Sequence, residues 1–283
     1  MNQETFRLCA FADEADKKLS GQIAALRENG ISQIELRGVN GKNVADFTPE
    51  ETRAIAAEFA AAGISVWSIG SPIGKVDIHD PAGQEFDRFR RVLETAVLCG
   101  AKNIRLFSFF GTEGDSAYFD EICRRLDDMA CAARGTGVRL CHENEKGIYG
   151  DNAARCLELY RALPEIGGIF DPANFVQCHQ DTIAAWALLR KYIHYAHIKD
   201  ACLDGHVVPP GTGAGCLGTL LGEFQKAGIE VLTLEPHLKV FKGLEALEGG
   251  KRPDVGGGDL VFATGREAFD YAVNALKNLI SNL

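Results

Sequence analysis

The sequence predicts an α/β protein built as a single (β/α)8 barrel, and three observations support this prediction. Short apolar runs that suit buried strands alternate with longer amphipathic stretches along the chain. Eight such runs follow one another, spaced about 30 residues apart. The chain has 283 residues, and a barrel of this kind takes roughly 250. An open doubly wound sheet is less favoured, because no G-x-G-x-x-G motif follows the first apolar run.

The predicted strands are all short and apolar: residues 6–11, 32–37, 64–70, 102–109, 138–143, 166–171, 193–199 and 230–235. Between them, apolar residues recur at three- and four-residue spacing, as in residues 19–30 and 49–63, which predicts helices. Glycine precedes several strands, where a left-handed residue would end a helix. We treat residues 1–283 as one domain, with residues 239–263 as a long loop after the eighth strand.

The composition restricts the class of protein. Hydrophobic residues make up 46% and charged residues 24%, as in ordinary globular proteins. No run reaches the roughly 20 apolar residues of a membrane-spanning helix, and the first residues do not resemble a signal peptide. The nine cysteines form no C-x-x-C pair, so we expect a reducing compartment, the cytoplasm. The net charge of −9 argues against a nucleic-acid surface.

Ionisable residues gather at the predicted carboxyl ends of the strands, where barrel enzymes have their active sites. Four of these residues come from four successive strands: Glu143, Asp171, His197 and Glu235. Taken singly, each has a structural alternative, such as a salt bridge or a turn. Together, three carboxylates and one imidazole suit a divalent cation, because the carboxylates would otherwise repel one another. We expect Mn²⁺ first, with Mg²⁺, Co²⁺ or Zn²⁺ as alternatives.

Five motifs in the second half of the chain resemble the xylose-isomerase-like barrel superfamily, and within it the sugar phosphate isomerase/epimerase group. They are HEN (142–144), FDPAN (170–174), HIKDA (197–201), PPGTGAG (209–215) and LEPH (234–237). The first half matches mainly in its strand–helix rhythm and in IELR (34–37). The group includes ketose 3-epimerases, hydroxypyruvate isomerase and inosose dehydratase. The resemblance therefore implies a metal-dependent enzyme acting on a small carbohydrate, without naming the substrate.

By this resemblance, the four strand-end residues map to the metal ligands of the superfamily. Glu143 and Glu235 would also face opposite sides of the substrate as acid and base. The implied reaction is isomerisation or epimerisation. The metal binds the carbonyl and a neighbouring hydroxyl and stabilises an enediolate. One glutamate removes the proton next to the carbonyl, and the other returns it to the opposite face or to the adjacent carbon.

Two positions depart from the superfamily pattern. Asn174 stands where many ketose epimerases have a histidine, and His206 is the nearest residue where members often have an arginine. We assign substrate contacts to these two residues and to four others near strand ends, so that the set reads Asn174, Lys199, His206, Lys75, Arg105 and Glu35.

Three other functions remain open. A lyase or dehydratase acting on a keto-sugar or keto-inositol would share the first proton abstraction. A metal-dependent endonuclease would need extra histidine ligands and a basic groove, neither of which is clear in this sequence. A barrel that only binds sugar would hold metal without exchanging a carbon-bound proton. We expect a small carbohydrate as the partner, neither nucleic acid nor membrane, and the sequence leaves a homo-oligomer open.

Overall fold

The computed structural model describes residues 6–239 and 261–283. Eight parallel strands form a closed barrel in the order β1-β12-β9-β8-β7-β6-β5-β2. The fold class and all eight predicted strands are confirmed, with strand bounds a few residues shorter than predicted. The strands are β1 Arg7–Ala10, β2 Gln33–Leu36, β5 Ser65–Ile69, β6 Asn103–Leu106, β7 Arg139–Glu143, β8 Gly167–Phe170, β9 Ile193–Ile198 and β12 Val231–Leu234.

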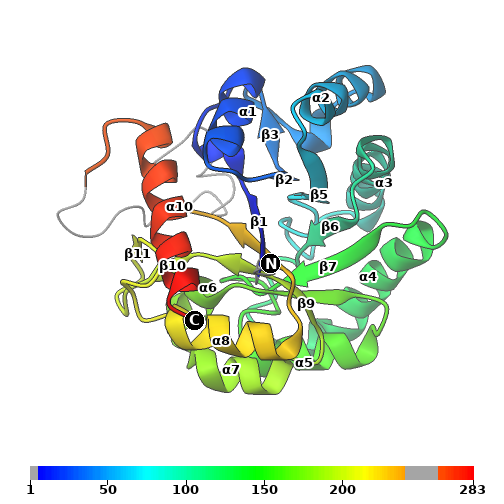
Figure 1. Cartoon of the computed structure of the whole chain (residues 1–283). Coiled ribbons are helices and arrows are strands. Elements are labelled where there is room, and N and C mark those ends of the chain that lie inside the picture. Colours follow the sequence, from blue (N-terminus) through cyan, green and yellow to red (C-terminus); the bar gives the residue numbers. More distant parts are fainter. Residues whose placement is uncertain (1–5, 240–260) are drawn as a thin grey trace.

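Helices surround the barrel (Figure 1). They are α1 Leu19–Glu28, α2 Pro49–Ala61, α3 Ala82–Cys99, α4 Phe119–Ala133, α5 Ala153–Ala162, α6 Pro172–Gln177, α7 Thr182–Leu189, α8 Leu217–Ala227 and α10 Gly265–Ser281. Local sequence sets several of their ends. Thr48 and Glu51 form a reciprocal capping box at the start of α2. Gly100 ends α3 and Gly228 ends α8 in the left-handed conformation, as expected.

Besides a small cluster of Ala173, Val176 and Ala201, the apolar core of the described residues has two parts. The larger one lies mostly between the strands and the surrounding helices, as in the contact of Trp186 with Phe224, whose ring centroids are 4.7 Å apart. The smaller one, which includes Cys9, Cys141 and Tyr195, comes from strand positions. Tyr195 is two residues before His197 on β9, so both side chains face the same side of the strand. The small core therefore lies beneath the polar residues at the carboxyl ends of the strands.

Two antiparallel hairpins follow barrel strands. The first pairs β3 Gly38–Val39 with β4 Lys42–Asn43, directly after β2. The second pairs β10 Asp200–Ala201 with β11 Val207–Val208, after β9. Short 3-10 helices η1 Ala12–Glu14, η2 Val44–Asp46 and η3 Ser116–Tyr118 complete the connections. The sequence predicted none of these small elements.

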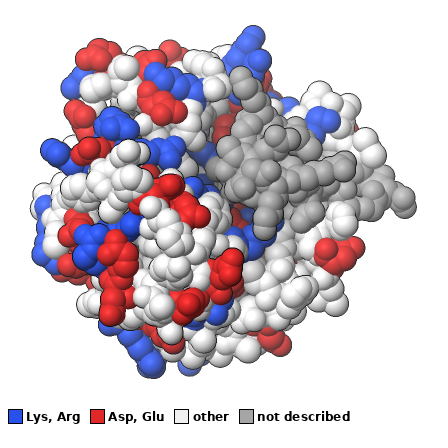
Figure 2. All heavy atoms as spheres, turned by 180° about the vertical axis from the view of Figure 1, so that it is seen from behind, with Lys and Arg blue, Asp and Glu red and all other residues white. Residues whose placement is uncertain are grey.

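Most of the predicted loop at residues 239–263 lies outside the described residues, so this prediction and the single-domain prediction stay predictions. No helix in the described part of the chain is long and apolar enough to cross a membrane. On the described surface of the face shown in Figure 2, acidic and basic side chains are interspersed.

Candidate metal-binding active site

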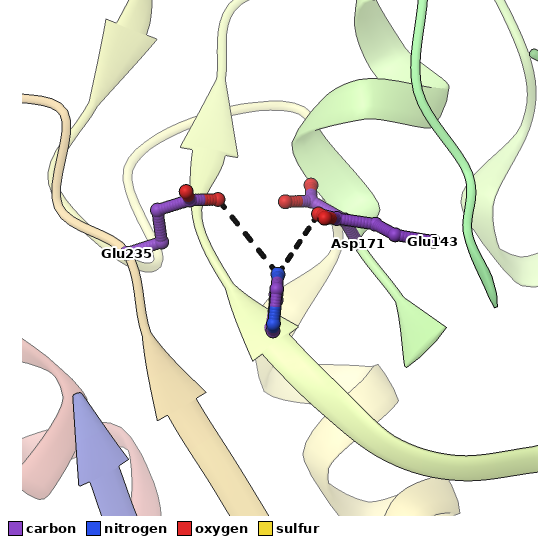
Figure 3. A group of neighbouring side chains, drawn as sticks. Glu143, Asp171 and Glu235 are labelled. Atoms are coloured by element: carbon purple, nitrogen blue, oxygen red, sulfur yellow. Dashed lines mark hydrogen bonds and ion pairs between the residues drawn. The ribbon is translucent and has the colours of Figure 1, made fainter. Parts of the chain in front are cut away.

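The structure brings the four strand-end residues together at the carboxyl end of the barrel. Each lies at or near the carboxyl end of a strand: Glu143 is the last residue of β7, Asp171 directly follows β8, His197 lies in β9, and Glu235 directly follows β12. Each offers one ligand atom, and these atoms all lie within 4.8 Å of one another. Figure 3 shows Glu235 approaching from the side opposite to Glu143 and Asp171. We call these residues the four-residue cluster.

The chemistry of the four-residue cluster fits a divalent cation. His197 Nδ1 lies 2.8 Å from Glu143 Oε1 and 3.8 Å from Glu235 Oε2. Asp171 Oδ2 is buried and accepts no hydrogen bond from any described residue, although the Lys199 ammonium lies 3.1 Å away. Buried oxygen and nitrogen atoms of this kind are the donors that Mn²⁺, Mg²⁺, Co²⁺ and Zn²⁺ accept.

The carboxylates of the cluster differ in acidity. Burial raises the pKa of Asp171 to about 7, although Lys199 opposes the shift. Burial would also raise the pKa of Glu235, but the charge of Lys199 and the neighbouring imidazoles of His237 and His197 hold it well below its usual range. Glu235 therefore carries a negative charge at neutral pH. A carboxylate held ionised in a buried site can act as a base toward a substrate.

Two of the predicted substrate residues contact the cluster directly. Lys199 Nζ lies 3.1 Å from Asp171 Oδ2 and 3.2 Å from Glu235 Oε2. The Arg105 guanidinium lies 3.1 Å from Glu143 Oε2 and 3.7 Å from Glu235 Oε1. Both cations are buried. Arg105 thus joins the two glutamates that the sequence predicts as acid and base.

Two further predicted residues lie beside the cluster. Asn174, in the first turn of α6, donates its side-chain amide to the Asn144 carbonyl at 2.9 Å and to Glu143 Oε1 at 3.4 Å. Lys75, after β5, forms a buried ion pair of 2.8 Å with Glu145 Oε2. The asparagine therefore orients a predicted ligand from the position where ketose epimerases have a substrate-contacting histidine.

The last two predicted substrate residues lie elsewhere. Glu35 of β2 is fully buried behind His197, with its Oε2 atom 3.1 Å from His197 Nε2. His206 lies on the turn of the β10–β11 hairpin, where its half-exposed ring is 3.2 Å from Asp204. Within residues 6–239 and 261–283, no contact joins His206 to the four-residue cluster. A strand-end position alone did not reveal which way either side chain points.

The predicted site residues did not include a group that surrounds Glu235, although Arg37 and His237 belong to the motifs IELR and LEPH. The guanidinium of Arg37, directly after β2, lies 3.1 Å from Glu235 Oε1, 3.0 Å from Glu14 Oε1 and 2.9 Å from Asp13 Oδ2. His237 Nε2 is 3.4 Å from both Glu14 and Glu235. The available signal was the acidic pair Asp13-Glu14, which closely follows the first strand.

Three cations near the cluster alternate with two aromatic rings. The Arg37 guanidinium lies 4.4 Å from the centroid of Phe11, and that of Arg105 lies 4.9 Å from the same ring. Arg105 is also 5.1 Å from the centroid of Phe107, which Lys75 approaches at 4.5 Å. Aromatic faces attract cations, and the rings keep the like charges apart. This stack fixes Arg105 between the two glutamates.

The sequence matches the family model described as "Xylose isomerase-like TIM barrel" over residues 23–249. The chain belongs to this family. The match covers most of the chain, in agreement with the closed barrel and with the resemblance of the motifs. A comparison with curated protein sequences finds no significant match.

Solved structures share the fold at low sequence identity. L-ribulose 3-epimerase has a TM-score of 0.75 at 16% identity, covering 98% of this chain and 95% of that one. The IOLI protein with a bound zinc atom has a TM-score of 0.74 at 18% identity, covering 98% and 99%. The probable 3-DHS dehydratase AsbF from Bacillus anthracis has a TM-score of 0.71 at 14% identity, covering 96% and 99%. Proteins with this fold thus include one described as an epimerase and one described as a probable dehydratase.

Proposed function

We propose that this protein is a divalent-metal-dependent isomerase or epimerase of a small ketose or a related polyol-derived substrate. The observation that carries the proposal is the arrangement of Glu143 and Glu235. They reach the four-residue cluster from opposite sides (Figure 3), and the guanidinium of Arg105 contacts both. Two carboxylates on opposite sides of one site can remove and return a proton on different faces of a substrate.

The four-residue cluster would hold the metal, for which Mn²⁺ is our first choice because three of the four donors are carboxylates. A bound divalent cation would supply Lewis-acid polarisation of a carbonyl and the neighbouring hydroxyl. Asn144 and Asn174 hold the surrounding side chains in place. Asn144 exchanges two hydrogen bonds of 2.9 Å with the backbone of Asp171, and Asn174 donates to Glu143.

The protein groups then move the proton. Glu235, which is ionised, takes the proton from the carbon next to the carbonyl, and the electron pair of that bond moves onto the carbonyl oxygen. The ammonium of Lys199 and the guanidinium of Arg105 favour the negative charge that develops there, because both lie within 4 Å of the acid–base carboxylates. Return of a proton by Glu143 to the opposite face of the same carbon gives an epimer. Return to the adjacent carbon gives an isomer.

The test is deuterium incorporation. Protein loaded with Mn²⁺ is incubated in D₂O with a panel of ketoses, and mass spectrometry and proton NMR follow exchange at carbon. We expect exchange on at least one ketose, and a loss of at least about 100-fold in Glu143→Gln and in Glu235→Gln. The matched control is Glu230→Gln, which removes an exposed carboxylate at the other end of the barrel. Unchanged exchange in both active-site variants would contradict the assignment.

A lyase is the second candidate, favoured by the structural similarity to the probable dehydratase AsbF. Abstraction of the same proton by Glu235 would be followed by departure of a hydroxyl from the next carbon, as water. The same experiment separates the two outcomes, since elimination gives a product lighter by one water molecule. Isomerisation leaves the mass of the substrate unchanged in H₂O.

A further inference from the structure

The two ring nitrogens of His197 face different carboxylates. Nδ1 points to the four-residue cluster, 2.8 Å from Glu143 Oε1. Nε2 points away from it, 3.1 Å from Glu35 Oε2. Both His197 and Glu35 are fully buried. An ionised carboxylate can only accept a hydrogen bond, so Nε2 must carry the hydrogen that it donates to Glu35. Nδ1 faces the carboxylate of Glu143, and it is then the nitrogen that would bind a cation, with release of the proton it shares with Glu143.

Glu35 is itself held by two hydroxyl groups. Tyr195 donates to Glu35 Oε1 at 3.0 Å, and Ser68 donates to the same oxygen at 3.3 Å. The two hydroxyl oxygens lie 3.1 Å apart, so either hydroxyl can donate to the other in place of Glu35. A shift in register between β2 and β5 after Ile34 pairs Glu35 with Ser68. The backbone thus brings the carboxylate and its hydroxyl partners into one layer of the barrel interior.

The ring of His197 cannot turn over without losing its hydrogen bond to Glu35. Phe11 packs edge-on against it, with centroids 5.3 Å apart and planes at 86°. A half-turn of the imidazole would exchange each nitrogen with a carbon, so Glu35 Oε2 would face a C–H group. The buried carboxylate oxygen would lose its donor, which costs free energy for a charged group that is fully buried. Glu35 therefore selects both the orientation and the tautomer of His197.

We propose that Glu35 is a positioning residue that fixes His197 with Nδ1 toward the four-residue cluster and strengthens its binding of a divalent cation. This inference rests on the proposed metal-dependent function, and it replaces the expected contact between Glu35 and the substrate. The negative charge of Glu35 raises the electron density on the imidazole, which makes Nδ1 a better ligand. Partners of this kind change metal affinity by about 10- to 100-fold when they are removed.

The experiment measures the dissociation constant for Mn²⁺ by competition with a chelating dye, for wild type and Glu35→Gln. Glutamine keeps the size of the side chain and removes only the charge, and we expect an affinity lower by about 10- to 100-fold. The matched control, Tyr195→Phe, leaves the Glu35 charge and the Ser68 hydrogen bond in place, so it stays within about threefold of wild type. The visible spectrum of the Co²⁺-loaded protein should change in Glu35→Gln and not in the control, which a purely structural role would not produce.

The outcomes separate this inference from the proposed function. If wild type and Glu35→Gln bind Mn²⁺ equally and give the same Co²⁺ spectrum, the positioning role is wrong and the metal site stands. If wild type itself binds no divalent cation, both proposals fail. Far-UV circular dichroism of the metal-free proteins checks folding. If Glu35→Gln does not fold, Glu35→Asp replaces it, because the shorter side chain keeps the charge but withdraws the carboxylate from His197 Nε2; an affinity within threefold of wild type would then overturn the inference.

Discussion

Replacing Asp200 with asparagine should destabilise the protein, because this one carboxylate organises the loop beside the site. Oδ1 accepts backbone N–H groups from Ala201 at 3.0 Å and Gly215 at 2.9 Å. Oδ2 accepts those of Gly211 at 2.9 Å and Gly213 at 3.0 Å. A side chain at Gly213 or at Gly215 would collide with the carboxylate, which explains these two glycines. The buried Asp200 therefore joins β10 to residues 211–215.

The size of the effect follows from the four hydrogen bonds. Asparagine keeps one oxygen, so two N–H groups retain an acceptor and the other two face an amide group that cannot accept. Losing two hydrogen bonds to a charged group costs about 3 kcal/mol at the lower end of the usual range. The unfolding entropy is about 2.1 cal/mol/K per residue, or roughly 0.6 kcal/mol/K for this chain. The expected fall in the melting temperature is about 5 °C.

Differential scanning calorimetry measures the melting temperatures of metal-free Asp200→Asn and metal-free wild type. The control is Asp204→Asn on the same hairpin, where the carboxylate is largely exposed and pairs with half-exposed His206. We expect the control to melt within about 1 °C of wild type, because exposed ion pairs contribute little. If Asp200→Asn melts as high as the control, the four hydrogen bonds do not stabilise the loop as we infer.

Three further predictions concern stability and catalysis. Gly74→Ala should lower the unfolding free energy by about 2–4 kcal/mol, because Gly74 has φ +84° and a Cβ there would meet the backbone of Phe107. Chemical denaturation measures this change. In the same assay the control Gly222→Ala should not lower the unfolding free energy, because a Cβ at Gly222 in α8 would enter open space. Burial lowers the pKa of His142 to about 3. Below about pH 6.5 this histidine therefore binds a proton in the unfolded chain but not in the folded protein. The free energy of unfolding consequently falls as the pH drops. Between pH 7 and pH 5, wild type should lose about 2 kcal/mol more than His142→Gln, and equal losses would refute this assignment. Lys199→Met should lower deuterium exchange at least about 10-fold while keeping the metal, measured on the Mn²⁺-loaded protein, and undiminished exchange would remove Lys199 from the mechanism.

The barrel was predictable from sequence because its signals are local and repeated. Each strand is a short apolar run, and glycines such as Gly100 and Gly228 mark helix ends. The β10–β11 hairpin was not predictable, since its register depends on the hydrogen bonds that Asp200 makes with a loop 11 to 15 residues later. The apolar run at residues 193–199 was read as a single strand, whereas β9 ends at Ile198.

The site was predictable to the extent that strand ends determine it. The carboxyl ends of parallel strands meet at one end of a barrel, which is why the four-residue cluster came together as expected. The contact between Glu35 and His197 was not predictable, because it depends on a register shift between β2 and β5 that sequence does not reveal. Glu14 was missed because a 3-10 turn, η1, carries it back to Arg37. His206 was assigned by its position in the sequence, and its hairpin carries it away from the cluster.

Metal content tests the central proposal most directly. Wild type and Glu235→Gln are each incubated with Mn²⁺, freed of unbound ions by gel filtration and analysed by plasma mass spectrometry. We expect about one Mn²⁺ per chain in wild type and a large reduction in Glu235→Gln, since the variant loses one of four ligands. Exposed Glu230→Gln should keep the wild-type content. The absence of bound Mn²⁺, Mg²⁺, Co²⁺ and Zn²⁺ from wild type after such incubations would contradict the metal site and the mechanism built on it.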